Sequence, residues 1–258
     1  MKNLLIICAL AIAVLSCKKE DDNPPLTQNP SEPTLELKLH SWFNLEELVP
    51  GETYLNVSNY RVNVTGLKLY LSDVYAVHSD GSTVALTDVA YFDLFNNEDG
   101  IVFSDIPSGE YTGFGFGLGV PPDMNSPQNP DFSIAVFDDN HPLSQSNGMF
   151  WVWQSGYRFV IFEGKYNTDP DGTDPLIDGY SYHTGKDESY RTVEFDNLNF
   201  EVESEGNKVI NLDFDVDRFY YSQNDTINIA VESQTHGTNQ DLSNRVSDNI
   251  IEAISFRE

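Results

Sequence analysis

Short segments of alternating apolar and polar residues recur along this chain and constrain its fold more than any other feature. In residues 34–40, Leu35, Leu37 and Leu39 share one face, because successive side chains of a strand point to opposite sides. Comparable segments cover 60–65, 67–71, 84–92, 110–118, 133–137, 149–162, 193–202, 209–216 and 226–231. About ten strands with no amphipathic helix between them predict an all-β fold, an antiparallel β-sandwich.

The C-terminal segment has a different period. Leu242, Val246 and Ile250 are spaced by four residues, which is typical of one face of a helix. Asn239 or Asp241 can cap its N-terminus. We therefore expect a short C-terminal helix that packs on the sandwich.

The N-terminus predicts export. Lys2 precedes an apolar run over residues 4–15, which is too short to span a membrane and is typical of a signal peptide. The following residues, Val14-Leu15-Ser16-Cys17, resemble the lipobox of bacterial lipoproteins, in which the cysteine is lipidated and becomes the mature N-terminus. The alternative is an ordinary signal peptide with a chance cysteine. We predict that residues 1–17 are a lipoprotein signal peptide.

Residues 18–33 form a predicted disordered tether, first Lys-Lys-Glu-Asp-Asp and then a stretch rich in Pro, Asn and Ser. Its lysine-then-acidic start resembles the export signal of surface lipoproteins in Bacteroidetes-type bacteria. Residues 34–258 contain no evident repeat or boundary, so we expect a single domain there. The predicted location is the cell envelope, at the outer membrane and exposed on its surface.

Charge and cysteine content exclude several classes of function. The chain has 41 acidic and 14 basic residues, a net charge of −27, whereas nucleic-acid binding needs a basic surface. Its two cysteines are Cys8, inside the predicted signal peptide, and Cys17. Disulfides, thiolate metal sites and cysteine nucleophiles are therefore excluded from the mature domain. A transition-metal site would have to use His, Asp, Glu, Met or a ligand derived from an aromatic residue.

Residues 141–157 concentrate chemically distinctive side chains. His141 begins the segment, and Met149, Trp151 and Trp153 share one face of an expected strand. Methionine can be a soft copper ligand and tryptophan can be oxidised. Large alternating apolar residues are also what a central core strand needs, so both interpretations stay open.

Three of the five histidines occupy positions suited to a site. His40, His141 and His183 lie at predicted strand ends or in loops, where a sandwich gathers functional groups, whereas His78 lies in a predicted turn. Neutral imidazole is a common ligand for copper and zinc. No two histidines have the spacing of a local metal motif, so a site would be assembled from separate segments.

An acidic loop is a second, weaker metal candidate. Asp169, Asp171, Asp174 and Asp178 surround Gly172, and such carboxylates can bind Ca²⁺. The spacing does not match an EF-hand, and a solvated acidic loop explains it as well. For catalysis, the chain has no Gly-x-Ser-x-Gly nucleophile elbow.

The order of the motifs resembles that of the MbnP-like family of copper-binding periplasmic proteins and lipoproteins. The resemblance covers roughly residues 34–256 and centres on His-Pro-Leu at 141–143 and Gly-Met-Phe-Trp-Val-Trp-Gln-Ser-Gly-Tyr at 148–157. His40, the segment 60–74, Glu163-Gly164, Tyr-His-Thr-Gly at 182–185 and the helix after His236 complete the series.

This resemblance implies a β-sandwich that binds copper through histidines, with His40, His141 and His183 as ligand candidates. In the best-known members a di-haem peroxidase-type partner oxidises a tryptophan to kynurenine, which supplies a further nitrogen ligand. Trp42, Trp151 and Trp153 are the candidates here, with Met149 as a soft ligand. We expect a non-enzymatic copper-binding lipoprotein for uptake or storage. The alternative is a surface module that binds glycans or proteins, with Trp42, or Tyr180 and Tyr182, exposed as a platform.

Overall fold

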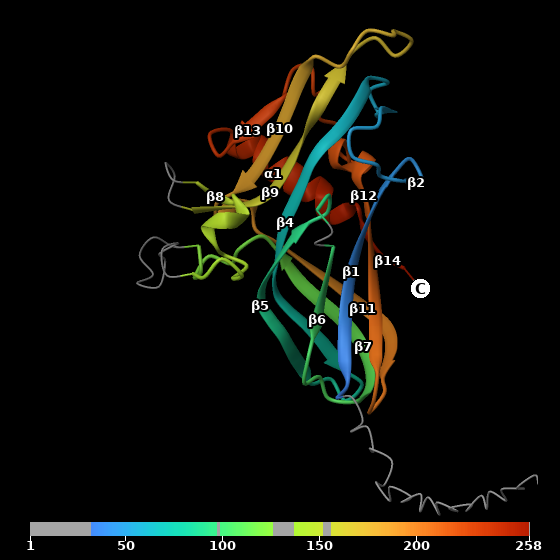
Figure 1. Cartoon of the computed structure of the whole chain (residues 1–258), viewed down its shortest axis with the longest axis vertical. Helices are drawn as coiled ribbons and strands as arrows, with labels where there is room; N and C mark the ends of the chain where they lie inside the picture. The colour runs from blue at the N-terminus through green and yellow to red at the C-terminus, as the bar shows by residue number, and fades with distance from the viewer. Residues whose placement is uncertain (1–31, 97–98, 126–136, 152–155, 258) are drawn as a thin grey trace, which may run out of the picture. The chain divides into compact units, whose positions relative to one another are not determined.

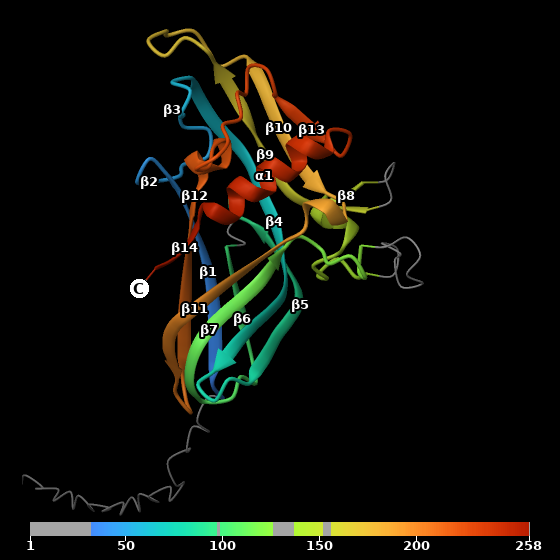
Figure 2. The same cartoon turned by 180° about the vertical axis from the view of Figure 1, so that it is seen from behind.

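The computed structural model describes residues 32–96, 99–125, 137–151 and 156–257, which form two β-sheets and one α-helix (Figures 1 and 2). The strands are β1 (Thr34–Phe43), β2 (Glu46–Glu47), β3 (Tyr54–Leu55), β4 (Arg61–His78), β5 (Thr83–Asp93), β6 (Gly100–Phe103), β7 (Gly109–Leu118), β8 (Phe150–Trp151), β9 (Gly156–Asn167), β10 (Asp178–Gly185), β11 (Arg191–Val202), β12 (Asn207–Asp215), β13 (Gln234–His236) and β14 (Ile254–Arg257). The helix α1 covers Gln240–Glu252, and short 3₁₀ turns are η2 (Gln145–Asn147), η3 (Asp187–Ser189) and η4 (Val216–Tyr220).

The larger sheet has the order β11-β7-β4-β9-β10-β13, with β3 and β5 also paired to β4 and β8 to β9. The smaller sheet has the order β14-β12-β1-β2, with β6 also paired to β1. Two pairs, β1 with β12 and β10 with β13, are parallel. The prediction of a β-rich, two-sheet fold is therefore confirmed, whereas the prediction of purely antiparallel sheets is wrong. Parallel pairing joins segments that are far apart in the chain, and hydrophobic periodicity carries no information about it.

The alternating segments do bury one face each. Leu35, Leu37 and Leu39 of β1 are inaccessible to solvent or nearly so, and they share one core with Leu69 and Leu71 of β4. A fully buried side chain of this size stabilises the fold by about 1.5–3 kcal/mol. The buried faces of these alternating segments therefore join the two sheets in one core.

The predicted helix is confirmed, and its apolar face packs into this core. Leu242, Val246 and Ile250 are buried, and the Asn239 side chain accepts a hydrogen bond from the Leu242 N–H at 3.2 Å, so Asn239 is the N-cap. In Figures 1 and 2, α1 lies against one face of the larger sheet beside β9 and β10. Phe162 of β9 and Tyr182 of β10 are buried in the same core as the apolar residues of α1, and the alternate residues of these strands lie on the opposite, outer face of the sheet.

A second, smaller apolar cluster is built on Met149, Tyr157 and Phe159, with Tyr70, Val89, Val120 and Leu143. Tyr157 and Tyr70 fix the segment 142–143 over it, because their hydroxyls donate to the carbonyls of Leu143 at 3.2 Å and Pro142 at 2.9 Å. The predicted strand 149–162 corresponds to two strands, β8 and β9. Residues 152–155, between them, lie outside the described part.

Other predicted elements differ. Residues 226–231 are not a strand: Ile227 and Ile229 are buried, but the Asn228 side chain and carbonyl accept hydrogen bonds from the amides of residues 230–232, which forms a turn. The segments 60–65 and 67–71 are one strand, β4, with a register shift at Gly66. The segment 133–137 lies almost entirely outside the described residues. The described strands number fourteen, not about ten, because short ones such as β6 and β14 show too little alternation to be recognised.

No helix in the described residues is both long and apolar enough to cross a membrane.

Candidate functional site

Four polar side chains meet on the outer face of the larger sheet, near its β13 edge. They are Glu163 of β9, Ser181 and His183 of β10, and His236 of β13. Register places them together: Ser181 lies opposite Glu163, and His183 opposite His236. Alternate residues of β10, Tyr180 and Tyr182, are buried on the inner face, so the sheet separates an apolar side from this polar group.

The four side chains form one hydrogen-bonded group. The imidazoles of His183 and His236 stack with ring centroids 4.6 Å apart and planes 13° apart. His183 Nε2 lies 2.5 Å from Glu163 Oε1, and the Ser181 hydroxyl donates to the same oxygen at 3.1 Å. The Nε2 atoms of His183 and His236 each lie 3.1 Å from Ser181 Oγ. We call these four residues the histidine-pair cluster.

Electrostatics favour an ionised carboxylate and a neutral imidazole within the histidine-pair cluster. The pKa of Glu163 is lowered, mainly by its hydrogen bond with His183. The pKa of His236 is also lowered, first by burial and then by the charge of His183. At neutral pH His236 is thus an uncharged base, the form that can bind a metal.

Trp151 lies beside the histidine-pair cluster. Its ring occupies the space that a side chain at Gly185, the last residue of β10, would fill. The Arg158 guanidinium lies 5.6 Å from the centre of that ring, and its charge acts on both Glu163 and His236. The Trp151 indole N–H is buried and has no hydrogen-bond acceptor among the described residues.

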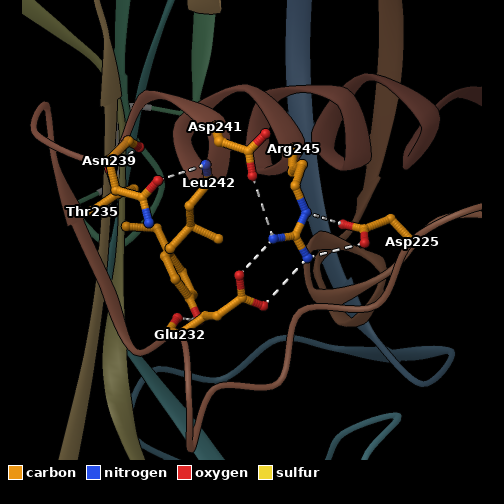
Figure 3. Close-up of polar contacts among 8 residues, drawn as sticks. Asp225, Glu232, Thr235, Asn239, Asp241, Leu242 and Arg245 are labelled. Carbon is orange, nitrogen blue, oxygen red and sulfur yellow. Dashed lines mark hydrogen bonds and ion pairs between the residues drawn. The ribbon is translucent and has the colours of Figure 1, made fainter.

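Two contacts hold the backbone that carries His236. Lys186 has φ 66° and ψ 157°, a conformation otherwise almost restricted to glycine, and its ammonium donates to the Gly237 carbonyl at 2.6 Å. Arg245 of α1 pairs with Asp225 at 2.8 Å and with Glu232 at 2.5 Å, on the segment that leads into β13 (Figure 3). A strained residue and a charged clamp thus hold β13 at the sheet edge.

His40 lies on the other sheet, among different partners. Its Nε2 is 2.9 Å from Asn211 Oδ1, and it borders a cavity of about 190 Å³ with Trp42 and Arg257. The Arg257 guanidinium covers the Trp42 ring at 4.7 Å while it pairs with Asp213 at 2.5 Å. Trp42 is therefore not an open platform.

His141 lies in the loop before η2 and has a third set of partners. Its ring stacks on Phe137 with centroids 4.1 Å apart, and its Nδ1 accepts a hydrogen bond from the Leu143 N–H at 3.0 Å. A neutral imidazole whose Nδ1 accepts must carry its proton on Nε2. This geometry leaves His141 no unprotonated nitrogen for a metal.

The remaining candidates are placed as follows. Met149 is fully buried in the second apolar cluster, and Trp153 lies outside the described residues. Arg61 fills the acidic loop, because its guanidinium donates to the carbonyls of Asp169 at 2.7 Å and Asp174 at 2.9 Å. The chain thus places its own cation in the loop that was the weaker Ca²⁺ candidate. Over all described residues, no group of three or more His, Cys, Asp or Glu side chains could hold a metal ion.

Comparison with known sequences decides the family. The sequence model of the MbnP family matches residues 32–241. The chain belongs to the MbnP family. This family is copper-associated.

The search of solved structures matched MbnP from Methylosinus trichosporium, with 18% sequence identity and a TM-score of 0.48 over 75% of this chain and 79% of that one. Comparison with curated proteins gave no match.

Within this MbnP-family chain, the structure brings one of the three predicted histidines, His183, to a second histidine. His40 and His141 share none of these partners. Of the two candidate tryptophans that the structure describes, Trp151 lies beside the histidine-pair cluster and Trp42 does not. The platform expected of the alternative function is absent at Tyr180 and Tyr182, which are 2% and 1% exposed.

Sequence reasoning missed Glu163, Ser181 and His236 as members of the site. Ser181 could have been found, because a period of two puts it on the same face as His183. Glu163 is one of 41 acidic residues, and His236 joins through a three-residue parallel strand, so neither carries a local signal.

Proposed function

We propose that this chain is a copper-binding lipoprotein of the cell envelope, anchored through Cys17, that holds copper for uptake or storage. Copper is its cargo, and His183 and His236 are the two imidazole ligands. The observation that carries the proposal is their proximity: two histidine rings from adjacent strands, with centroids 4.6 Å apart, in a member of a copper-associated family. The rings are nearly parallel, so one of them must rotate for both to face the same ion.

The donor set fits copper. Imidazole nitrogen is a preferred ligand of copper, and a carboxylate that hydrogen-bonds a ligating histidine orients the ring and raises its basicity. Glu163 is that carboxylate for His183. The pair replaces the set His40, His141 and His183 expected from the sequence, because those three have separate partners and His141 uses its free nitrogen on the backbone.

A catalytic role is not proposed. A serine–histidine–acid triad places the hydroxyl and the carboxylate on opposite ring nitrogens. Here Ser181 and Glu163 both contact Nε2 of His183. The hydroxyl is therefore not set up to lose its proton to a base that the carboxylate supports.

Copper titration of single variants tests the function. We expect the purified domain to bind copper, His183→Ala and His236→Ala to lose that binding, and His40→Ala and His141→Ala to keep it. The last two are matched controls, because they remove a partly exposed histidine elsewhere. Binding that depends on His40 and His141 instead would replace the pair by the sequence-based set. If no variant changes binding, or nothing binds, the proposal is wrong.

A further inference from the structure

We propose that the outer face of β4, β7 and β11 binds neutral oligosaccharides of pyranose sugars, with the rings of Tyr75 and Tyr190 as the stacking platform. This face belongs to the larger sheet but lies apart from the histidine-pair cluster, because β7 and β11 are at the opposite edge of the sheet from β10 and β13. In Figures 1 and 2 it occupies the lower part of the sheet, whereas α1 and β8 lie higher. The proposal does not depend on copper.

Three glycines leave the outer face of β7 flat. Gly113, Gly115 and Gly117 alternate with Phe114 and Phe116, which are buried in one core with the leucines of β1. The glycines therefore lie on the opposite face, away from the smaller sheet. Glycine inside a strand weakens the strand and marks a place where another group approaches the backbone closely.

The ring of Tyr75 is the group that approaches Gly115. Register places Tyr75, Gly115 and Glu194 in one row across β4, β7 and β11. The Tyr75 hydroxyl donates to Glu194 Oε1 at 2.9 Å, although two inter-strand spacings, about 9–10 Å, separate the two strands. A tyrosine side chain reaches that far only when it lies along the sheet, and a side chain at Gly115 would collide with the ring. Tyr75 is partly exposed and Glu194 is exposed, so the ring presents its other face to solvent.

Tyr190 makes the matching contact from the opposite direction. Its hydroxyl donates to Asp73 Oδ2 at 3.0 Å and lies 3.0 Å from Ser72 Oγ, so the side chain crosses β7 from the start of β11 towards β4. A side chain at Gly117 would collide with this ring. Gly115 and Gly117 are about 7 Å apart along the strand. The two tyrosines thus occupy neighbouring positions with a spacing on the scale of adjacent sugar units.

Flat aromatic rings with fixed hydroxyls suit the apolar face of a sugar. A pyranose with equatorial hydroxyls has a flat face of C–H groups that carry partial positive charge, and the face of an aromatic ring is negative. Beside Tyr75, the exposed side chains of Thr192, Glu194 and Asp196 alternate along β11 and can form hydrogen bonds with sugar hydroxyls. Ala85 of β5, opposite Tyr75, is small and exposed and leaves that side of the ring open.

The charge of this face selects neutral sugars over acidic ones. Its ionised groups are the carboxylates of Asp73, Glu194 and Asp196, and the strand positions described above include no basic residue. Burial and the hydrogen bond to Glu194 raise the pKa of Tyr75 to about 12, so the phenol stays neutral. Uronic acids, sulfated glycans and phosphates would be repelled by the carboxylates, whereas neutral sugars would not.

Calorimetric titration of the purified protein with cellohexaose and with chitohexaose tests the site. We expect at least one of these neutral hexasaccharides to bind, Tyr75→Phe to keep that binding, and Tyr75→Leu to weaken it by about 10-fold or more. Both variants lose the hydrogen bond to Glu194 and keep a side chain over Gly115, so the aromatic face is what separates them. Tyr60→Leu, a partly exposed tyrosine before the other end of β4, is the matched control and should bind like the wild type. Thermal unfolding checks that each variant is folded.

The proposal is overturned if neither hexasaccharide binds. Equal binding by Tyr75→Leu and the wild type also overturns it, because the rings would then serve only to cover the glycines. Tighter binding of a hexamer of galacturonic acid would contradict the charge argument. His183→Ala should bind the sugar like the wild type, and Tyr75→Leu should bind copper like the wild type, so the failure of one proposal is distinguishable from the failure of the other.

Discussion

Asp217 shows at the level of one residue how burial makes stability depend on pH. It lies in η4 with 6% of its surface exposed, and burial, with repulsion from Asp215, raises its pKa from 3.8 to about 6. The folded state therefore binds the proton more tightly than the unfolded chain does. Its favourable contribution is complete below about pH 4 and is lost as the pH rises towards 6. At neutral pH the charged form destabilises the fold by roughly 2–3 kcal/mol.

Asp217→Asn should therefore increase the free energy of unfolding at about pH 7.5 by roughly 2 kcal/mol and change it much less at about pH 4. Urea unfolding of the variant and the wild type at both pH values measures this difference. Asp171→Asn, in the exposed acidic loop, is the control and should have little effect. An equal gain from Asp217→Asn at both pH values would contradict the argument.

Single residues also show what sequence reasoning can reach. His183 is a candidate from the sequence because a polar residue at the end of an alternating segment is recognisable locally, and the structure places it beside His236. His141 was predicted from its loop position, but the Leu143 amide that occupies its Nδ1 becomes visible only once the loop is folded. Glu163 and His236 depend on register between strands, and a hydrogen bond between strands leaves no mark in either segment alone.

At the level of elements, the local sequence pattern predicts the buried faces and the helix. The pairing of β9, β10 and β13 determines which side chains meet in the histidine-pair cluster. Residues 34–40 and 240–252 are recognisable because each repeats its own period. β13 has three residues and no period, and it reaches β10 because α1 and Lys186 hold its ends. The cluster thus depends on a short strand that the helix anchors.

Arg245→Lys tests that anchor. Lysine keeps the charge but cannot bind Asp225 and Glu232 as a planar fork, so we expect the unfolding free energy to fall by about 1–2 kcal/mol. Amides held by this region, such as Ser181 N–H on the Ser233 carbonyl, should exchange faster with solvent. Hydrogen exchange followed by mass spectrometry measures this locally.

The matched control is Arg257→Lys, which weakens the pair with Asp213 on the other sheet. It should affect exchange in β14 and β12 and leave the segment around β13 unchanged. If Arg245→Lys exchanges there like the wild type, α1 does not anchor β13 and its role in placing His236 must be abandoned.

For the whole molecule, the sequence predicts different roles for its two parts. Residues 34–257 form the sheets and the cluster without a cysteine, whereas export and attachment are predicted for residues 1–33 from the sequence alone. Cys17 lies outside the described residues, so its role is a prediction from the sequence. A net charge of −27 concentrates cations around the protein over roughly one Debye length, about 8 Å at physiological salt, and this suits a cation carrier held at a membrane.

Cys17→Ala should release the protein from the membrane. Acyl chains bind a bilayer with about 0.8 kcal/mol per buried methylene, and alanine has no thiol to carry them. We expect the full-length wild type to partition into the detergent phase and Cys17→Ala to stay in the aqueous phase, with copper binding of its folded domain unchanged. Cys8→Ser removes the other cysteine inside the predicted signal and should partition like the wild type. A Cys17→Ala protein that still partitions with detergent would show that attachment does not depend on this cysteine, and the lipoprotein part of the proposal would fall while the histidine-pair cluster kept its own test.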